Sequence, residues 1–321
     1  MRTALVLGAG GFTGQAFHLG ALCALADLTG FDGRRADTLV GTSAGSLVAA
    51  GLAGGLSAAD LGNELTGDPI SAEGARIRRR AHQLGLAART LAEPPAAAPS
   101  GWGPLAPTVL LAALRHPLRT RPTAVLSSLL PAGRQDTGPI ERGVRHLHGD
   151  DWPDRDLRIC ALRTRDAQRV VFGTPGAPQT DVGTAVAASC AIPGYFTPVR
   201  LGGQSYVDGG GHSPTNADVL VADRPALVVV LSPMSVGKAP RASADLALRL
   251  AVRRRLAAEV RLLRQAGAEV VVVQPTAADL AVMGLNPMRA ARVGDVISTV
   301  AASVRTRLEA QPRLVDVLAQ R

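Results

Sequence analysis

Residues 38–45 read TLVGTSAG, a short apolar strand that ends in a serine flanked by glycines. A run of small residues with helical character follows over residues 44–52. Strand, sharp turn and helix in this order form the context of a nucleophile elbow, where glycines relieve crowding and the serine Oγ projects beyond the strand. We therefore predict that Ser43 is a nucleophile and that Gly41 and Gly45 are its motif glycines. A serine that only caps the helix is the structural alternative.

A second glycine-rich turn lies near the N-terminus, where the apolar strand 4–7 runs into GAGGFTG at residues 8–14. The amides of such a turn, with the positive end of the following helix, bind either the pyrophosphate of a dinucleotide or an oxyanion. A dinucleotide site needs an acidic residue at the end of the second strand, whereas this strand ends at Ser43. We therefore predict an oxyanion hole, and a nucleotide-binding reductase is the alternative hypothesis. The predicted donors are the backbone amides of Gly10, Gly11, Phe12 and Ala44.

An aspartate suited to proton transfer stands at the end of another strand, in the stretch YVDGGG at residues 206–211. The glycines after it allow the backbone to fold closely, so that Asp208 can reach Ser43 directly as a general base. An ordinary Asp-Gly hairpin turn is the structural alternative. His212 is the one histidine after Asp208 and would complete a Ser-Asp-His triad. It lies only four residues from Asp208, and we expect a structural role for it.

The remaining pattern alternates strands and helices, which predicts an α/β protein with a mainly parallel sheet and crossover helices. Residues 157–162 and 169–172 alternate as the two strands of a hairpin. The β-branched runs 227–231 and 270–273 predict fully buried central strands. Residues 244–266 predict a long amphipathic helix with leucines on one face and arginines on the other.

The length of 321 residues permits one large domain, and we expect a single domain over residues 1–321. Residues 65–138 depart from the alternation and are rich in arginine, proline and alanine, which indicates an inserted helical cap with a flexible stretch. With 46% hydrophobic residues but only 3% aromatics, the core must consist mainly of alanine, valine and leucine.

The formal net charge of +9 comes almost entirely from arginine, with clusters at residues 76–80 and 253–255. No aromatic residues interleave with these clusters, so we expect solvated helix faces, weak affinity for anionic membrane and no nucleic-acid binding. The three cysteines and six histidines lack metal-ligand spacing, which predicts no metal site and no disulfide framework. We find no signal peptide or membrane-spanning run, and expect a cytoplasmic protein with peripheral membrane contact at most.

Taken together, four motifs resemble those of the patatin-like phospholipase family and occur in its order. The family pattern combines an N-terminal glycine loop, a G-x-S-x-G nucleophile, an A-S-x-A-x-P-x-x-F segment and an Asp-Gly base motif. The matching stretches are residues 10–14, 41–45, 188–196 and 208–210, and Asn216 also fits the pattern. The motif glycines are Gly14, Gly41, Gly45, Gly209 and Gly210.

The resemblance implies a three-layer α/β/α fold with a central, mainly parallel sheet. It also implies a Ser-Asp dyad, in which Asp208 is the general base on Ser43 and an acyl-enzyme forms without any cofactor. The implied activity is that of a serine acyl hydrolase, which cleaves carboxylic ester bonds of lipids as a phospholipase A, lysophospholipase or esterase. An acyltransferase with the same dyad and a non-catalytic lipid-binding relative are the alternatives. Tyr195 and Phe196 are then expected to line the acyl pocket or to pack beneath the base loop.

Two positions depart from the family pattern. Ala9 stands where members usually carry glycine, and Thr13 where they carry arginine or lysine. The first change is small, but we expect the missing cation to weaken either a preference for a phosphate headgroup or the anchoring of the glycine loop.

Overall fold

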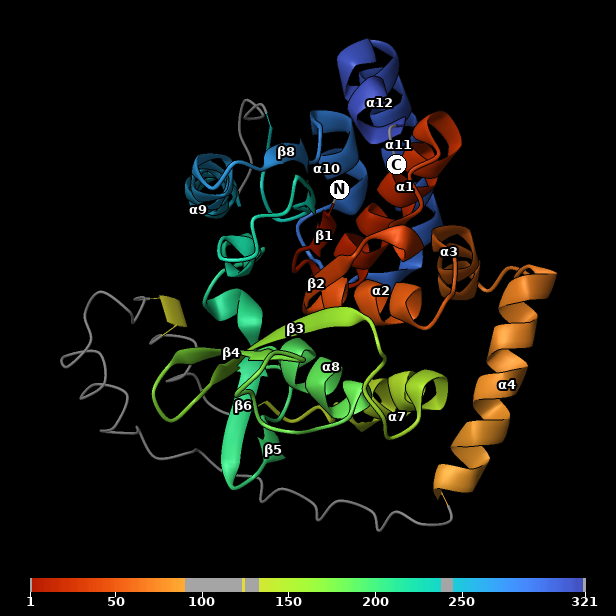
Figure 1. Ribbon diagram of the computed structural model, residues 1–321, viewed down its shortest axis with the longest axis vertical. Helices are drawn as coiled ribbons and strands as arrows, with labels where there is room; N and C mark the ends of the chain where they lie inside the picture. Colours follow the sequence, from red (N-terminus) through yellow and green to blue (C-terminus); the bar gives the residue numbers. More distant parts are fainter. Residues whose placement is uncertain (1, 90–122, 125–132, 238–244, 320–321) are drawn as a thin grey trace.

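A computed structural model describes residues 2–89, 123–124, 133–237 and 245–319 (Figure 1). Its centre is an eight-stranded sheet with the order β5-β6-β3-β2-β1-β7-β8, in which β4 also pairs with β3. The strands are β1 (Thr3–Leu7), β2 (Thr38–Thr42), β3 (Asp156–Arg163), β4 (Gln168–Phe172), β5 (Val199–Leu201), β6 (Gln204–Asp208), β7 (Leu227–Leu231) and β8 (Glu269–Val273).

Strand directions confirm the predicted mainly parallel sheet. β3, β2, β1, β7 and β8 pair in parallel, in that order. β4 and β6 pair with β3 antiparallel, and β5 pairs with β6 antiparallel. The predicted hairpin is therefore present as β3 and β4, while the antiparallel strands extend the sheet on one side only.

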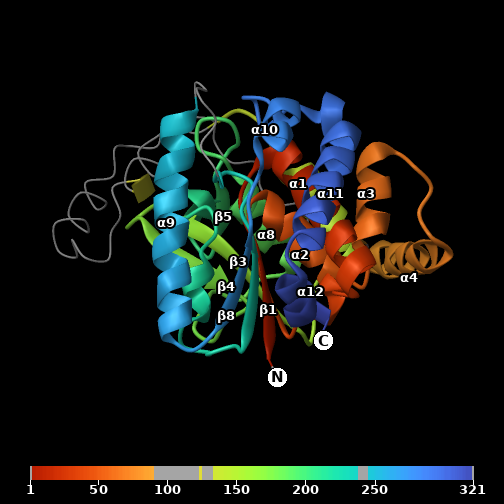
Figure 2. The same cartoon turned by 90° about the horizontal axis from the view of Figure 1, so that it is seen from above.

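Helices cover both faces of the sheet, which gives the three layers that the family resemblance implies (Figure 2). α9 packs on one face, and α1, α2 and α11 pack on the other. The helices are α1 (Gly11–Thr29), α2 (Ala44–Ala53), α3 (Ala58–Thr66), α4 (Ala72–Arg89), α7 (Gly138–His148), α8 (Val182–Cys190), α9 (Leu246–Gln265), α10 (Ala277–Met283), α11 (Val293–Glu309) and α12 (Pro312–Ala319).

The two cores are separated by the sheet itself, as β1 illustrates. Side chains alternate across a strand, so Leu5 and Leu7 enter the core beneath α1 and α11, while Ala4 and Val6 enter the core beneath α9. All five residues of β1 are buried. A strand that is covered on both faces has a continuous apolar sequence. Because β1 and β2 are buried in this way, they hold the glycine loop after β1 and the turn at Ser43 after β2 in fixed positions.

The position predicted for residues 270–273 is wrong, because β8 is the edge strand of the sheet and not a central one. Its valines are nevertheless mostly buried, since helices cover both faces there, and Val270 and Val271 enter different cores. A continuous apolar run indicates that both faces of a strand are covered. It does not indicate whether the strand lies at the centre or at the edge of the sheet. β7, in contrast, is fully buried between β1 and β8 as expected.

The predicted division of α9 into a leucine face and an arginine face is also wrong in part. Leu248 and Leu262 are exposed, whereas Arg249 and Glu259 are buried. Arg249 donates hydrogen bonds to the Asp245 carboxylate and, at 3.0 Å, to a backbone carbonyl. Polar groups with such partners tolerate burial, which a hydrophobic pattern does not reveal.

The arginine clusters lie on helices, as expected, but one arginine of each cluster forms ion pairs. Arg78 on α4 pairs with Glu64, and Arg255 on α9 pairs with both Asp218 and Glu259. The other arginines of residues 76–80 and 253–255 are exposed to solvent.

The expected cap over residues 65–138 lies largely outside the described residues, and the single-domain organisation stays a prediction. Within the described part of that stretch, α4 is a helix that contacts α7. None of the described helices is long and apolar enough to cross a bilayer.

Candidate active site

Ser43 and Asp208 meet because two strands end beside each other on β3. β2 runs parallel to β3 and ends with Thr42 opposite Cys160. β6 runs antiparallel to β3 and ends with Asp208 opposite Ala161, the next residue along β3. The carboxyl ends of β2 and β6 therefore face each other. Ser43, directly after β2, lies close enough to Asp208 for its side chain to lower the pKa of that carboxylate.

The backbone at Ser43 turns sharply from β2 into α2. Its φ of 54° and ψ of −124° lie where non-glycine residues are rare and strained. The glycines around it are required by space, because a Cβ on Gly41 would lie 2.5 Å from Ser46 Cα, and one on Gly45 2.0 Å from the Leu7 carbonyl oxygen. This strained strand-to-helix turn is the geometry of a nucleophile elbow.

Hydrogen bonds from neighbouring serines hold the elbow in place. The Ser43 amide donates to Ser189 Oγ at 2.8 Å, and Ser189 Oγ in turn donates to the Cys160 carbonyl at 2.7 Å. The Ser43 carbonyl accepts from both the amide and the hydroxyl of Ser46, at 2.8 and 2.6 Å. The Ser43 amide already donates a hydrogen bond to Ser189 Oγ, so donors for an oxyanion must come from other residues.

Asp208 is a buried carboxylate, with 5% of its surface exposed. Burial raises its pKa to about 6, against the opposing effect of hydrogen bonds from Ser43 and from the Gly210 amide. The Gly210 amide donates to Asp208 Oδ1 at 2.7 Å, and the Asp208 amide donates to the Ala191 carbonyl at 2.9 Å. Asp208 is therefore a firmly held carboxylate that is more basic than an exposed aspartate yet mostly ionised at neutral pH.

The predicted oxyanion donors lie at the first turns of two helices. Gly11 and Phe12 begin α1, and Ala44 begins α2. First-turn amides have no acceptor within their own helix. Among the described residues, no acceptor outside the helix is recorded for the amides of Gly10, Gly11, Phe12 and Ala44. The next amide in α1, that of Thr13, is bound to the Pro287 carbonyl at 3.1 Å.

The glycine loop is bound to the segment that follows Asp208. The Ala9 amide donates to the Pro214 carbonyl at 2.8 Å, and a Cβ on Gly210 would lie 3.3 Å from Ala9 Cβ. Three segments far apart in the sequence, those around Ala9, Ser43 and Asp208, therefore come together. The arrangement combines a hydroxyl, a buried carboxylate and backbone amides at the first turns of two helices. These are the groups that acyl transfer requires.

A family model described as patatin-like phospholipase matches residues 5–221, about two thirds of the chain. The chain belongs to the patatin-like phospholipase family. Membership implies lipid acyl hydrolase activity, as the sequence motifs also do. No curated protein matches the chain.

Among solved structures, this chain is similar to VipD from Legionella pneumophila, with 14% identity and a TM-score of 0.42 over 96% of this chain and 67% of that chain. It is also similar to the type III effector protein ExoU, with 18% identity and a TM-score of 0.37 over 96% of this chain and 53% of ExoU. The ExoU–SpcU complex from Pseudomonas aeruginosa gives 21% identity, a TM-score of 0.37 and coverage of 96% and 51%. This chain thus spans about half of ExoU, and the family assignment rests on the sequence match.

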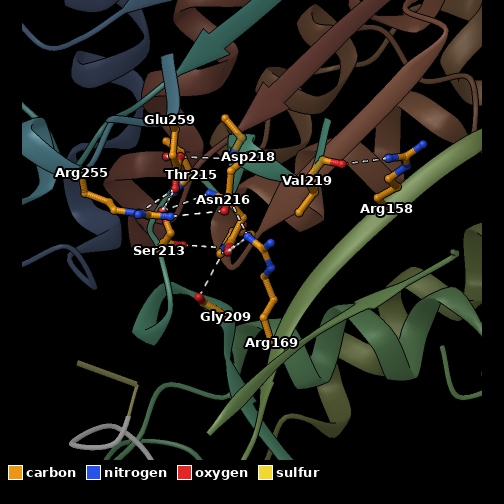
Figure 3. Close-up of polar contacts among 12 residues, drawn as sticks. Arg158, Arg169, Gly209, Ser213, Thr215, Asn216, Asp218, Val219, Arg255 and Glu259 are labelled. Atoms are coloured by element: carbon orange, nitrogen blue, oxygen red, sulfur yellow. Dashed lines mark hydrogen bonds and ion pairs between the residues drawn. The ribbon is translucent and has the colours of Figure 1, made fainter. Parts of the chain in front are cut away.

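One buried side-chain amide connects the two sides of the site. Asn216 Nδ2 donates to Thr42 Oγ1 at 3.1 Å. It also donates to the Gly209 carbonyl at 3.4 Å (Figure 3). Thr42 directly precedes Ser43, and Gly209 directly follows Asp208. Asn216 therefore fixes the spacing between the two strand ends. The family pattern in the sequence included this residue, but its contacts could only come from the structure.

A buried glutamate on α9 anchors the loop that carries Asn216. Glu259 is fully buried and accepts hydrogen bonds from the Ser213 and Thr215 hydroxyls, both at 2.6 Å (Figure 3). It also accepts one from the Ala217 amide at 3.0 Å. Arg255 pairs with it at 2.9 Å. Sequence analysis missed Glu259, and the one local signal for it was the Arg255–Glu259 spacing of four residues on a helix.

Neither His18 nor His212 carries charge at neutral pH. Burial lowers the pKa of His18 to about 4, and burial together with nearby Arg169 lowers the pKa of His212 to about 4. His18 Nε2 hydrogen-bonds the Gly8 carbonyl at 2.7 Å and so supports the glycine loop. Among the described residues, no three His, Cys, Asp or Glu side chains gather as metal ligands.

Tyr195 and Phe196, the predicted substrate-binding residues, lie in the segment that also contacts Asp208. Tyr195 is 45% exposed, and its ring meets Phe196 edge-on with centroids 4.8 Å apart. Their backbones bond with Gly133 and Gln135. Neither residue lines the cavity described below, so their role in substrate binding stays a prediction.

Proposed function

We propose that this family member hydrolyses carboxylic ester bonds of lipids through a Ser43–Asp208 dyad. In the first step the Asp208 carboxylate takes the Ser43 Oγ proton while Oγ adds to the ester carbonyl carbon. The new negative charge on the carbonyl oxygen is stabilised by the amides of the glycine loop and of Ala44. The intermediate then expels the alcohol, which takes the proton from Asp208, and Ser43 remains acylated.

The second step releases the acid by the same groups. Asp208 takes a proton from a water molecule, and the resulting hydroxide oxygen adds to the acyl carbon. Collapse of the second tetrahedral intermediate breaks the bond to Ser43 Oγ, which recovers the proton from Asp208. The products are a carboxylic acid and an alcohol, and the enzyme returns to its starting state.

The observation that supports the proposal is the contact between Ser43 and a buried Asp208 with a pKa of about 6. A carboxylate is a weak base for a hydroxyl, so such a dyad needs a carboxylate of raised pKa that is still ionised at neutral pH. The oxyanion donors at Gly11, Phe12 and Ala44 supply the rest of the transition-state stabilisation, with about 3 kcal/mol for a typical donor.

Hydrolysis of a medium-chain p-nitrophenyl ester and of phospholipid vesicles tests this function. Ser43→Ala and Asp208→Asn should each lower kcat by about a thousandfold or more, because both steps need both groups. His212→Ala is the matched control and should keep activity within about fivefold. Turnover that survives in Asp208→Asn, or is lost in His212→Ala with the fold intact, would overturn the dyad.

The same assay separates hydrolysis from acyl transfer. A competing alcohol acceptor is added, and the products are resolved by mass spectrometry. We expect free acid to dominate at acceptor concentrations well below that of water. Predominant ester exchange would instead identify an acyltransferase that uses the same dyad.

We further propose a reducing, cytoplasmic location with weak peripheral binding to anionic membrane. Cys23, Cys160 and Cys190 are all free thiols, which suits a reducing compartment. The net charge of +9 favours anionic surfaces. Flotation with phosphatidylglycerol vesicles, compared with phosphatidylcholine vesicles, should recover more protein, and equal recovery at low salt would contradict membrane affinity.

A further inference from the structure

We infer that a cavity between α1, α2, α3, α4 and α7 binds the acyl chain of the substrate and sets its preferred length. This inference rests on the proposed function, since it assigns the part of the substrate that leads away from Ser43. The cavity has a volume of about 320 Å³. Figure 1 shows α3 and α7 next to α2, with α4 farther out at the edge of the molecule, where it contacts α7.

Helix geometry places one wall of the cavity directly beyond the nucleophile. Residues three and four apart share one face of a helix. Leu47, Ala50 and Gly51 line the cavity and follow Ser43 by four, seven and eight positions, so they continue the face of α2 that begins at Ser43. With a helical pitch of about 5.4 Å, the wall starts about one turn from the reacting hydroxyl.

α1 approaches the cavity in the same way. Gln15 lines the cavity and lies four residues after Gly11 and three after Phe12, two of the predicted oxyanion donors. The amides that receive the ester oxygen and the serine that attacks the carbonyl thus both lie one turn above the same cavity. In this proposal, a chain attached to that carbonyl carbon runs along α1 and α2 into the cavity.

The wall chemistry suits a hydrocarbon chain. Leu61 and Leu65 on α3, and Ile140, Val144 and Leu147 on α7, supply apolar side chains. A chain of methylenes gains free energy in such an environment, whereas a sugar, a nucleotide or a phosphate headgroup would lose hydrogen bonds to water.

The two charged lining residues neutralise each other. Arg78 on α4 donates to both carboxylate oxygens of Glu64 on α3. Their side chains are about one third exposed, so the pair lies at the solvent side of the cavity. No free charge from these two groups is directed at a ligand, which again favours an apolar occupant.

Small residues keep the cavity open. Ala50, Gly51 and Gly143 contribute little or no side-chain volume to the lining. A Cβ at Gly143 would meet no atom within 4 Å, so there is open space beside it. Gly143 is an exposed lining residue, so a larger side chain there can be accommodated at the cavity without displacing its neighbours, which makes this position suitable for a test.

The predicted consequence is a chain-length preference. Each methylene buried from water contributes about 0.8 kcal/mol, which corresponds to about a fourfold rise in kcat/KM per methylene. In p-nitrophenyl esters from butyrate to palmitate, the wild-type protein should show this rise until the cavity is full and a plateau or decline beyond.

Gly143→Leu is the test variant and Gly143→Ala its matched control. Both replace a helical glycine and both raise helix propensity, but leucine brings three more carbons than alanine. Gly143→Leu should shorten the preferred chain by about three carbons, which lowers kcat/KM for the longest good wild-type substrate about 50-fold. Butyrate hydrolysis should change less than about twofold, and Gly143→Ala should keep the wild-type profile. Circular dichroism and Tm confirm that each variant is folded.

The outcomes distinguish this inference from the proposed function. If Ser43→Ala is inactive but Gly143→Leu keeps the wild-type length profile, the cavity is not the acyl site and the dyad stands. If no ester is hydrolysed, or Ser43→Ala turns over as wild type does, the proposed function fails. In that case, calorimetric measurement of dodecanoate binding tests by itself whether the cavity binds an acyl chain. Binding by the wild type and Gly143→Ala with at least tenfold loss in Gly143→Leu supports the cavity, and equal or absent binding in all three overturns it.

Discussion

Replacement of Asp208 by asparagine should remove catalysis and at the same time stabilise the fold, by an amount that depends on pH. Asparagine keeps the local contacts, because its Oδ1 can accept from the Gly210 amide and its Nδ2 can donate to Ser43 Oγ. What it removes is the cost of a buried negative charge. That cost appears as the rise of the Asp208 pKa from 3.8 to about 6.

The magnitude follows from linkage between ionisation and folding. Because the folded pKa is raised, the native state binds the proton more tightly than the unfolded state, and unfolding free energy falls as pH rises from about 4 to about 6. A shift of about two pKa units corresponds to about 3 kcal/mol. The stability of Asp208→Asn relative to wild type should thus grow by about 2.5 kcal/mol between pH 4 and pH 8, the rest of the effect lying below pH 4.

Urea unfolding followed by circular dichroism at several pH values measures this difference. All other titrating groups are common to both proteins and cancel when the two unfolding free energies are subtracted. Ser43→Ala is the control. It keeps the Asp208 carboxyl, so its pH dependence should be at least as steep as that of wild type, because a bond that lowers the pKa is lost. A difference between Asp208→Asn and wild type that stays constant across pH would refute the reasoning.

Three further predictions concern the same site. The profile of kcat/KM against pH should rise to a half-maximum near pH 6, because the Asp208 base must be ionised and its pKa is raised, and a profile flat through pH 6 would exclude Asp208 as the base. Ser189→Ala should destabilise the protein by about 1–3 kcal/mol in chemical unfolding and lower kcat, since it leaves the buried Ser43 amide without its acceptor; unchanged stability would contradict this role. Gly45→Ala should lower stability by about 3 kcal/mol or more, because its Cβ would lie 2.0 Å from a carbonyl oxygen. Gly62→Ala is the control and should be nearly neutral, since its Cβ would have its nearest contact at 3.8 Å. Similar melting temperatures for the two variants would argue against the close approach at Gly45.

Local patterns were sufficient for much of the fold and for the sharp turn at Ser43, while the roles of Ser43 and Asp208 stay predictions. A short apolar strand, a turn and a helix of small residues identified the elbow at Ser43, and the register on β3 places it against Asp208. Such features are determined by a few neighbouring residues in the sequence, so their geometry can be inferred without knowledge of the remaining chain.

Features that depend on tertiary contacts could not be inferred. The hydrogen bonds of Glu259 come from a loop more than forty residues away, and nothing local distinguishes this buried glutamate from the exposed residues of α9. Pro287 meets the glycine loop from a segment that the motifs do not include. The edge position of β8 depends on the order of strands, which an apolar run does not encode.

Covalent labelling by a fluorophosphonate tests the central claim most directly, because it requires an activated serine but no knowledge of the lipid. Intact-mass analysis and peptide mapping should find one adduct per chain, on Ser43. The labelling rate of Asp208→Asn should be at least about a hundredfold lower than that of wild type, because its serine lacks a base. Ser43→Ala should not react. An adduct on another residue, or equal labelling rates in wild type and Asp208→Asn, would contradict a serine activated by Asp208.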